Sequence, residues 1–136
     1  MVLKKEFILV AIIFSLIIFL EILTNNISEK YIELLLFKTE MILNDIEVLE
    51  KQNDIELLKK INFKIDDLKK EWMEKENILA LYIEHDELEK VTKNLIALEE
   101  NVKNSEYSQA LEDLREFEFS INHFNEKDKV ILKNIF

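Results

Sequence analysis

Glycine and proline are both absent from the 136 residues of this chain. Average usage of about 7% glycine and about 5% proline would place roughly ten and seven of them in a chain of this length. Without glycine, the chain has no residue suited to phosphate-binding loops, the dinucleotide-binding turn, tight β-hairpin turns or the EF-hand loop. The sequence therefore predicts an all-α fold.

The N-terminal segment is the most apolar part of the chain. Residues 7–20 carry no charge, and the apolar stretch continues to Leu23 with a single glutamate, Glu21, inside it. A helix over residues 7–23 spans about 26 Å, close to the hydrocarbon thickness of about 30 Å. The long side chains of Lys4, Lys5 and Glu21 can extend to the membrane interface and cover the difference.

These features predict a transmembrane anchor over residues 1–25 and one further domain over residues 26–136. A cleaved signal peptide and a buried helix of a soluble protein are the competing interpretations. The residues that follow the apolar stretch offer no pair of small side chains for signal cleavage, which favours an uncleaved anchor. Lys4 and Lys5 are the positive residues near the start, and they favour a cytoplasmic N-terminus, a single pass through the cell membrane and an extracytoplasmic domain.

The charge balance restricts the partners of that domain. The chain has 18 lysine and arginine residues against 28 aspartate and glutamate residues, a formal net charge of −10. Because the positive and negative charges of residues 1–23 cancel, the whole excess falls on residues 24–136. A domain this acidic repels phosphate backbones, so we expect no nucleic-acid partner. The chain contains no cysteine, which excludes disulfides and thiolate sites.

After the anchor, apolar residues recur at helical spacing and predict an antiparallel bundle of about four helices. The tail from Asn125 onward, polar and then apolar again, is expected to fold back on this bundle. The helices are predicted at residues 28–50, 54–83, 88–102 and 107–124.

Capping patterns indicate where these helices begin. Asn26 and Asn53 are each followed three residues later by glutamate, the spacing of a capping box. Asp86 is a third candidate cap, so we place a bend at residues 84–87, although no residue there forbids a continuous helix. Asn104 and Ser105 mark the break before the last helix.

The first predicted helix is apolar over much of its circumference. Its main row is Tyr31, Leu34, Leu35, Ile42, Ile46 and Leu49, and its second row is Ile32, Leu36 and Leu43. Such a helix either lies centrally in a bundle or also contacts a partner. We take the second row as a candidate partner contact, and we add Phe119, which falls off the apolar stripe of its helix as Phe63 does.

Signatures of catalysis are missing from the sequence. Neither His85 nor His123 lies in an H-E-x-x-H or E-x-x-H pattern. Glu84, His85, Asp86 and Glu89 could offer ligands to a divalent metal, but a capping cluster at a bend explains them as well. Trp72 lies on a heptad stripe, which favours core packing over ligand stacking. We expect no enzyme activity, no catalytic or metal site and no cofactor.

The order of several residues resembles a known family. They follow the apolar segment as Trp72, Glu76, Leu79, Tyr82-Ile83, His85, Glu87-Leu88, the Asn-Ser turn with Ala110, and Asn134-Ile135. This pattern is similar to the uncharacterised bacterial domain of unknown function 4363, small membrane-anchored proteins of clostridia and related spore-formers. The resemblance implies an extracytoplasmic helical domain without an established activity. It also implies a multi-pass membrane neighbour, from the domain of unknown function 421 family.

Two functions from different classes fit these observations. The first is an accessory or interaction subunit of a membrane partner, held at the membrane by the anchor. The alternative is an extracytoplasmic bundle that senses a small ligand between its helices, although the chain carries no output segment after the bundle. The heptad stripes are compatible with a homo-oligomer as well as with an internal core.

Overall fold

The protein is almost entirely helical. The structure, a computed structural model, describes the backbone of residues 2–81 and 83–135, and the side chains of residues 4–23, 26–27, 29–81 and 83–126. No strand occurs in the described part of the chain, which confirms the all-α prediction. The helices are α1 (Val2–Lys51), α2 (Ile55–Leu79), α3 (His85–Lys103) and α4 (Tyr107–Ile135).

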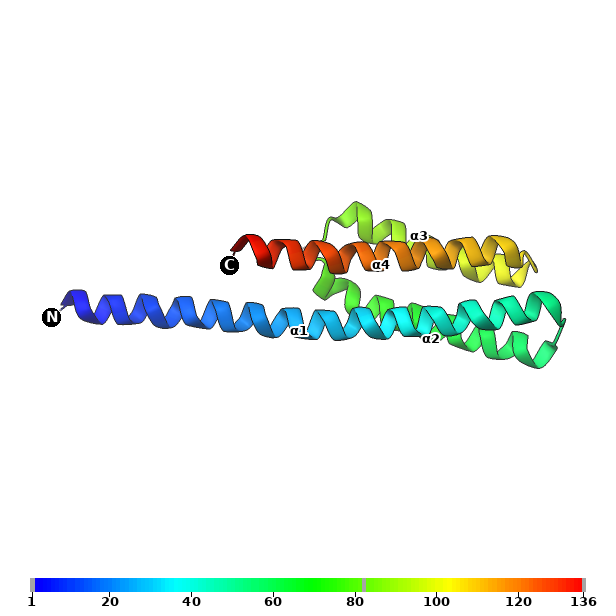
Figure 1. Ribbon diagram of the computed structural model, residues 1–136, viewed down its shortest axis with the longest axis horizontal. Coiled ribbons are helices and arrows are strands. Elements are labelled where there is room, and N and C mark those ends of the chain that lie inside the picture. The colour runs from blue at the N-terminus through cyan, green and yellow to red at the C-terminus, as the bar shows by residue number, and fades with distance from the viewer. Residues whose placement is uncertain (1, 82, 136) are drawn as a thin grey trace.

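The helices form an antiparallel bundle in which each successive helix reverses direction (Figure 1). Helix α1 packs against α2 and α4, and α3 packs against the same two helices from the other side. The N-terminal part of α1 extends well beyond the other helices, and the C-terminal end of α4 points toward the same side (Figure 1). The predicted antiparallel bundle is therefore confirmed.

Helix α1 runs without a break from the apolar segment into the bundle. The predicted start of a separate helix at residue 28, with Asn26 as its N-cap, is wrong, because residue 26 lies inside a helix of 50 residues. Asparagine lowers helix stability only slightly compared with glycine or proline. Since helical segments flank residues 24–26 on both sides, these polar residues continue the helix instead of ending it.

The break before α2 lies where it was expected, but a different residue forms the cap. Asp54, and not Asn53, is the N-cap, and its Oδ1 accepts a hydrogen bond of 3.0 Å from the backbone N–H of Glu56. A carboxylate at this position also interacts favourably with the positive end of the helix dipole.

The turn between α2 and α3 comes earlier than predicted. Helix α2 ends at Leu79 and α3 begins at His85, so the break between the helices lies before His85 and not at residues 84–87. Glu84 is the N-cap without a side-chain hydrogen bond, so the predicted cap at Asp86 is wrong. The buried Ile83 gives a physical reason, because an earlier turn places its side chain in the core.

The last helix follows a tight turn without glycine. Ser105 adopts the left-handed region, with φ at 59°. The break at Asn104 and Ser105 is confirmed, since α3 ends at Lys103 and α4 begins at Tyr107. The final residues do not fold back, because α4 continues as one helix to Ile135.

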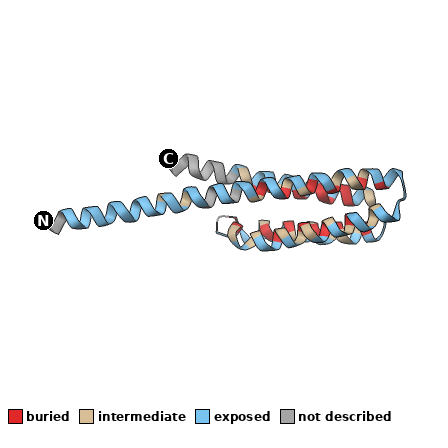
Figure 2. Cartoon of the chain, turned by 90° about the horizontal axis from the view of Figure 1, so that it is seen from below, coloured by how far each residue is buried: buried red, intermediate tan, exposed pale blue. Residues whose placement is uncertain are grey.

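The core is centred on Trp72, which is buried as predicted. Its ring meets Phe117 edge to face at 6.1 Å and stacks against Phe124 at 6.5 Å. Its indole N–H donates to the Thr92 hydroxyl at 2.9 Å, so its polar atom is satisfied as well. Buried residues line the inside of the bundle, whereas the protruding part of α1 is exposed (Figure 2).

Asp113 is an acidic side chain inside this largely apolar bundle. It is 8% exposed, and its carboxylate accepts a hydrogen bond of 2.6 Å from the amide of Asn101. Burial raises the pKa of Asp113, and the charges of Glu116 and Glu112 act in the same direction, against the hydrogen bond from Asn101. The folded state therefore binds the proton more tightly than the unfolded state does.

We expect Asp113→Asn to raise the melting temperature at pH 7. The pKa of Asp113 is higher in the folded state than in the unfolded state. Its contribution to the free energy of unfolding is therefore greatest below the unfolded pKa and is lost as pH rises through the folded pKa. An amide keeps the shape and removes the buried charge. Thermal melts followed by circular dichroism between about pH 3 and pH 7 should show the difference disappearing in acid. The exposed Glu118→Gln on the same helix is the control, and equal melting temperatures for wild type and Asp113→Asn at pH 7 would contradict the prediction.

Candidate partner-binding surfaces

Within the described residues, one helical segment is long and apolar enough to cross a membrane, Lys4–Leu23 in α1. None of this 20-residue segment is buried inside the protein (Figure 2). The core helix of a soluble protein would be mostly buried, so that interpretation does not fit. A signal sequence near the N-terminus shares the length and composition of this segment.

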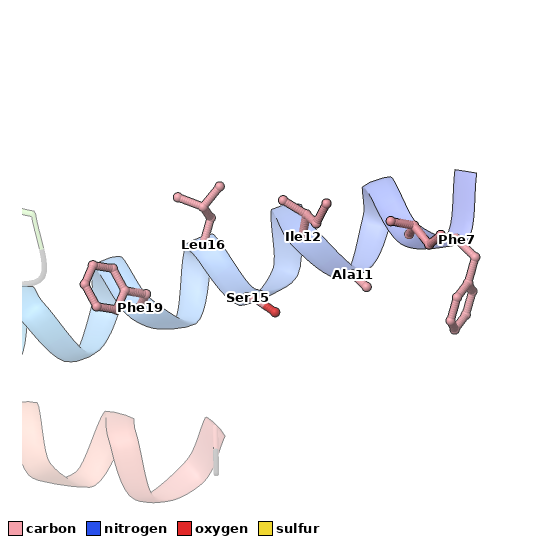
Figure 3. Close-up of a pocket in the computed structure, with 7 residues that line it drawn as sticks. Phe7, Ala11, Ile12, Ser15, Leu16 and Phe19 are labelled. Atoms are coloured by element: carbon pink, nitrogen blue, oxygen red, sulfur yellow. The ribbon is translucent and has the colours of Figure 1, made fainter. Parts of the chain in front are cut away.

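A shallow groove runs along the apolar segment (Figure 3). Its volume is about 500 Å³, and it is lined by Phe7, Ile8, Ala11, Ile12, Ser15, Leu16 and Phe19. The small side chains of Ala11 and Ser15 lie on successive turns, between the rings of Phe7 and Phe19. Small residues at this spacing let a second membrane helix approach closely.

The bundle begins a short distance after the apolar segment. The ammonium group of Lys75 in α2 lies 3.4 Å from the ring centre of Tyr31 in α1, a cation–π contact that joins the two helices near this end. Tyr31 follows the end of the segment by about 12 Å along a helix. The bundle is therefore held close to the apolar segment by one continuous helix.

The predicted second row of α1 does not form a free surface. Ile32 is only 1% exposed and belongs to the core, so its prediction as a partner contact is corrected. Leu36 and Leu43 are half-buried and pack against the core. The reason is that α1 lies between α2 and α4, which together cover a wider arc of its surface than a single neighbour would.

We expect Leu36→Ser combined with Leu43→Ser to destabilise the bundle. Each change removes half-buried apolar surface next to the core, so a loss of about 1–2 kcal/mol per site follows. Urea unfolding of the full chain in detergent, followed by circular dichroism, would measure it. Unchanged stability would show that these leucines are dispensable for packing and available to a partner.

The exposed apolar surface of α1 lies elsewhere, at Leu34, Phe37 and Met41. Phe37 is 60% exposed. These residues line a groove of about 200 Å³ between α1 and α2, together with Lys38, Lys64 and Asp67. Sequence reasoning assigned Leu34 to the core row and did not single out Phe37 or Met41. Each of the three residues follows a core residue by two positions, which is a rotation of about 200° around the helix. This spacing is the sequence signal that places them on the outer face.

Ion pairs hold the edges of this groove. Lys38 donates to Asp67 at 2.6 Å and lies 3.4 Å from Glu71. Although burial opposes it, the hydrogen bond to Asp67 and the charges of Glu71 and Asp67 raise the pKa of Lys38. Lys64 donates to Asp45 at 2.5 Å. These helix-bridging groups fix α2 against α1.

Phe119 is on the surface of α4, as predicted. It is 74% exposed, and its ring stacks parallel to the His123 imidazole at 6.4 Å. It lines an open groove of about 380 Å³ that also contains Lys90 of α3 and Arg115 of α4. Phe63 of α2 is 75% exposed, so the two phenylalanines match in exposure and differ in position.

The side chains weighed as metal ligands are not assembled into a site. Among the side chains that the structure describes, no group of three or more histidine, aspartate or glutamate residues is placed to hold a metal ion. His85 and Asp86 begin α3 at the surface, and Glu89 is exposed one turn later. His123 pairs with Phe119 instead of with a carboxylate.

Comparison with known proteins identifies the bundle. No curated protein and no solved structure matches the chain. The sequence model of a family described as a domain of unknown function, DUF4363, matches residues 27–135, which begin just after the apolar segment and include the second half of α1 and helices α2, α3 and α4. The chain therefore belongs to the DUF4363 family.

Proposed function

We propose that this protein is a non-catalytic, single-pass membrane subunit whose helical bundle binds another membrane protein outside the cytoplasm. The observation that carries the proposal is the continuity of α1, which joins a fully exposed apolar segment to the bundle core. Exposed apolar side chains along 20 residues are unfavourable in water and favourable in lipid.

The orientation follows from the flanking charges. Lys4 and Lys5 precede the apolar segment, and positive residues are retained on the cytoplasmic side. The acidic bundle then lies on the outer face, with the turn between α2 and α3 nearer the membrane than the turns at residues 52–54 and 104–106 (Figure 1).

We expect the full chain to remain in the membrane pellet after alkaline carbonate extraction. Because the chain has no cysteine, Glu106→Cys provides a unique label in the bundle and Glu6→Cys a unique label before the span. A membrane-impermeant maleimide should modify Glu106→Cys in intact cells and Glu6→Cys only after lysis. Release of the chain by carbonate would contradict the anchor, and the reverse labelling pattern would contradict the orientation.

The proposed partner is an integral membrane protein with several spans, for which a member of the domain of unknown function 421 family is the leading candidate. Two features support a partner in the same membrane. The groove over Ala11 and Ser15 fits the close approach of a second membrane helix. The exposed Phe119 offers an aromatic anchor on the bundle, in a groove that Lys90, Arg115, Glu112 and Glu116 line with charges of both signs.

The packing of the core argues against the alternative of a ligand-sensing bundle. The pocket between α2 and α3 beside Trp72 is only about 120 Å³, so a larger ligand would have to occupy the centre of the bundle. In the described core that centre is filled by Trp72, Phe117 and Phe124, which are all buried and in mutual contact through the tryptophan.

Phe119→Ser should lower the recovery of the membrane partner, and Phe63→Ser should not. An aromatic anchor in an interface typically contributes about 2 kcal/mol or more, equivalent to a decrease of about thirtyfold in affinity. Both side chains are about three-quarters exposed, so neither change should unfold the bundle. Crosslinking in intact cells, followed by purification of the tagged chain and mass spectrometry, measures recovery. Equal recovery from both variants would remove Phe119 from the interface.

A further inference from the structure

Helix α1 carries an exposed apolar stripe beside the groove that it forms with α2. We call the residues Ile27, Leu34, Phe37, Met41 and Val48 the outer stripe. Each is exposed, whereas the core residues of α1 lie on a different face of the helix. Leu34, Met41 and Val48 each follow a core position (Ile32, Thr39 and Ile46) by two residues, a rotation of about 200° around the helix.

The spacing of the outer stripe is that of a coiled coil. Ile27, Leu34, Met41 and Val48 follow one another at intervals of one heptad, and Phe37 lies three residues after Leu34. Positions a and d of a heptad have this spacing, and they form a straight seam only when a second helix supercoils around the first. A single exposed leucine needs no explanation, but a row repeated from Ile27 to Val48 does.

The same face continues into the apolar segment. Leu23 and Leu16 precede Phe37 by two and three heptads, and both are exposed. Leu16 also lines the groove over Ala11 and Ser15, so the two faces meet at this residue. Nearly every residue of the segment is apolar, so a heptad row there cannot be told apart from the other faces of the helix. The evidence for the row is therefore the residues after Leu23, and the apolar segment only continues it.

We propose that the outer stripe joins two copies of this chain in a parallel, two-fold symmetric dimer. The orientation rests on the proposed anchoring, since two copies in one membrane place their α1 helices parallel and at the same height. A heptad row that meets its own copy in register packs identical residues against each other, which is how parallel coiled coils self-associate. A different partner would need a matching heptad row at the same height.

Charges on the two flanks of the outer stripe support a second copy as the occupant. Lys38 and Lys64 lie on the flank toward α2, where they already pair with Asp67 and Asp45. Glu33 lies on the other flank of α1, five residues before Lys38. Two-fold symmetry brings Glu33 of one copy against Lys38 of the other, the g-to-e pairing of a parallel coiled coil. Each ammonium group has three donors, so lysines that already bind Asp67 and Asp45 can bond a further carboxylate.

Asn44 favours one register of the row. It occupies the d position one heptad after Phe37 and is exposed. Lys30, at the d position one heptad before Phe37, is also exposed, so its ammonium group can extend into solvent away from its counterpart. An asparagine in a coiled-coil seam bonds to its counterpart and favours the aligned pairing at a cost in stability. The dimer is thus in register, with each residue of the row next to the same residue of the other copy.

Single cysteines test this arrangement, since the chain contains none of its own. Full-length Leu34→Cys and Met41→Cys are oxidised in native membranes, with Glu40→Cys and Phe119→Cys as controls on the flank and on a distant helix. A disulfide needs Cα atoms within about 7 Å, so the two stripe variants should form at least about fivefold more dimer than the controls. The product should have twice the mass of the chain by non-reducing electrophoresis and mass spectrometry.

Several outcomes would overturn the dimer. They are the absence of disulfide at both stripe positions, equal yields at stripe and control positions, and a disulfide from the stripe to a different protein. A second measurement uses Phe37→Glu with Met41→Glu, which should convert the dimer to monomer in light scattering of the detergent-solubilised chain. Circular dichroism checks that the double variant stays folded, and carbonate extraction of the same variants shows separately whether the anchor itself holds.

Discussion

The structure depends on the unbroken helical hydrogen bonding of α1 through residues 24–26. This continuity makes the apolar segment and one wall of the bundle parts of a single rod of 50 residues. No flexible linker separates them, so the orientation of the segment determines the orientation of the bundle. A helix this long is marginal in water where nothing packs against it, and α2 and α4 provide that packing for its second half. Under the proposed anchoring, a bilayer would surround its first half.

Inside the bundle, apolar packing and ion pairs have different effects. The apolar interior, centred on Trp72 and its two phenylalanine neighbours, supplies the driving force for association of the helices. Ion pairs lie along the seams between neighbouring helices, as Lys64 with Asp45 and Lys69 with Glu99 do. Hydrogen bonding from Lys69 lowers the pKa of Glu99, in spite of the opposing effect of burial. Such half-exposed pairs add modest stability and help to fix which helices become neighbours.

The sequence was sufficient to predict the helical class, the bundle and the buried Trp72. These predictions rest on the absence of glycine and proline and on regular apolar spacing, which can be recognised without knowledge of tertiary contacts. It was insufficient where tertiary contacts decide between local alternatives. Asn26 has a capping pattern, yet the helices on both sides continue through it. Ile32 and Phe37 are both apolar residues of one helix, and only the positions of α2 and α4 decide that the first is buried and the second exposed. The exposed Phe119 was predictable, since it falls off the stripe of its own helix.

The rod has a mechanical consequence. From the end of the apolar segment at Leu23 to the end of α1 at Lys51, the helix rises about 42 Å. Under the proposed anchoring, it would act as a lever that pivots in the lipid. A change in tilt of about 20°, the average inclination of membrane helices, would swing the far end of the bundle sideways by about 14 Å. A change in membrane thickness or in a neighbouring protein that alters the tilt of α1 would therefore move the far end of the bundle, well above the bilayer surface.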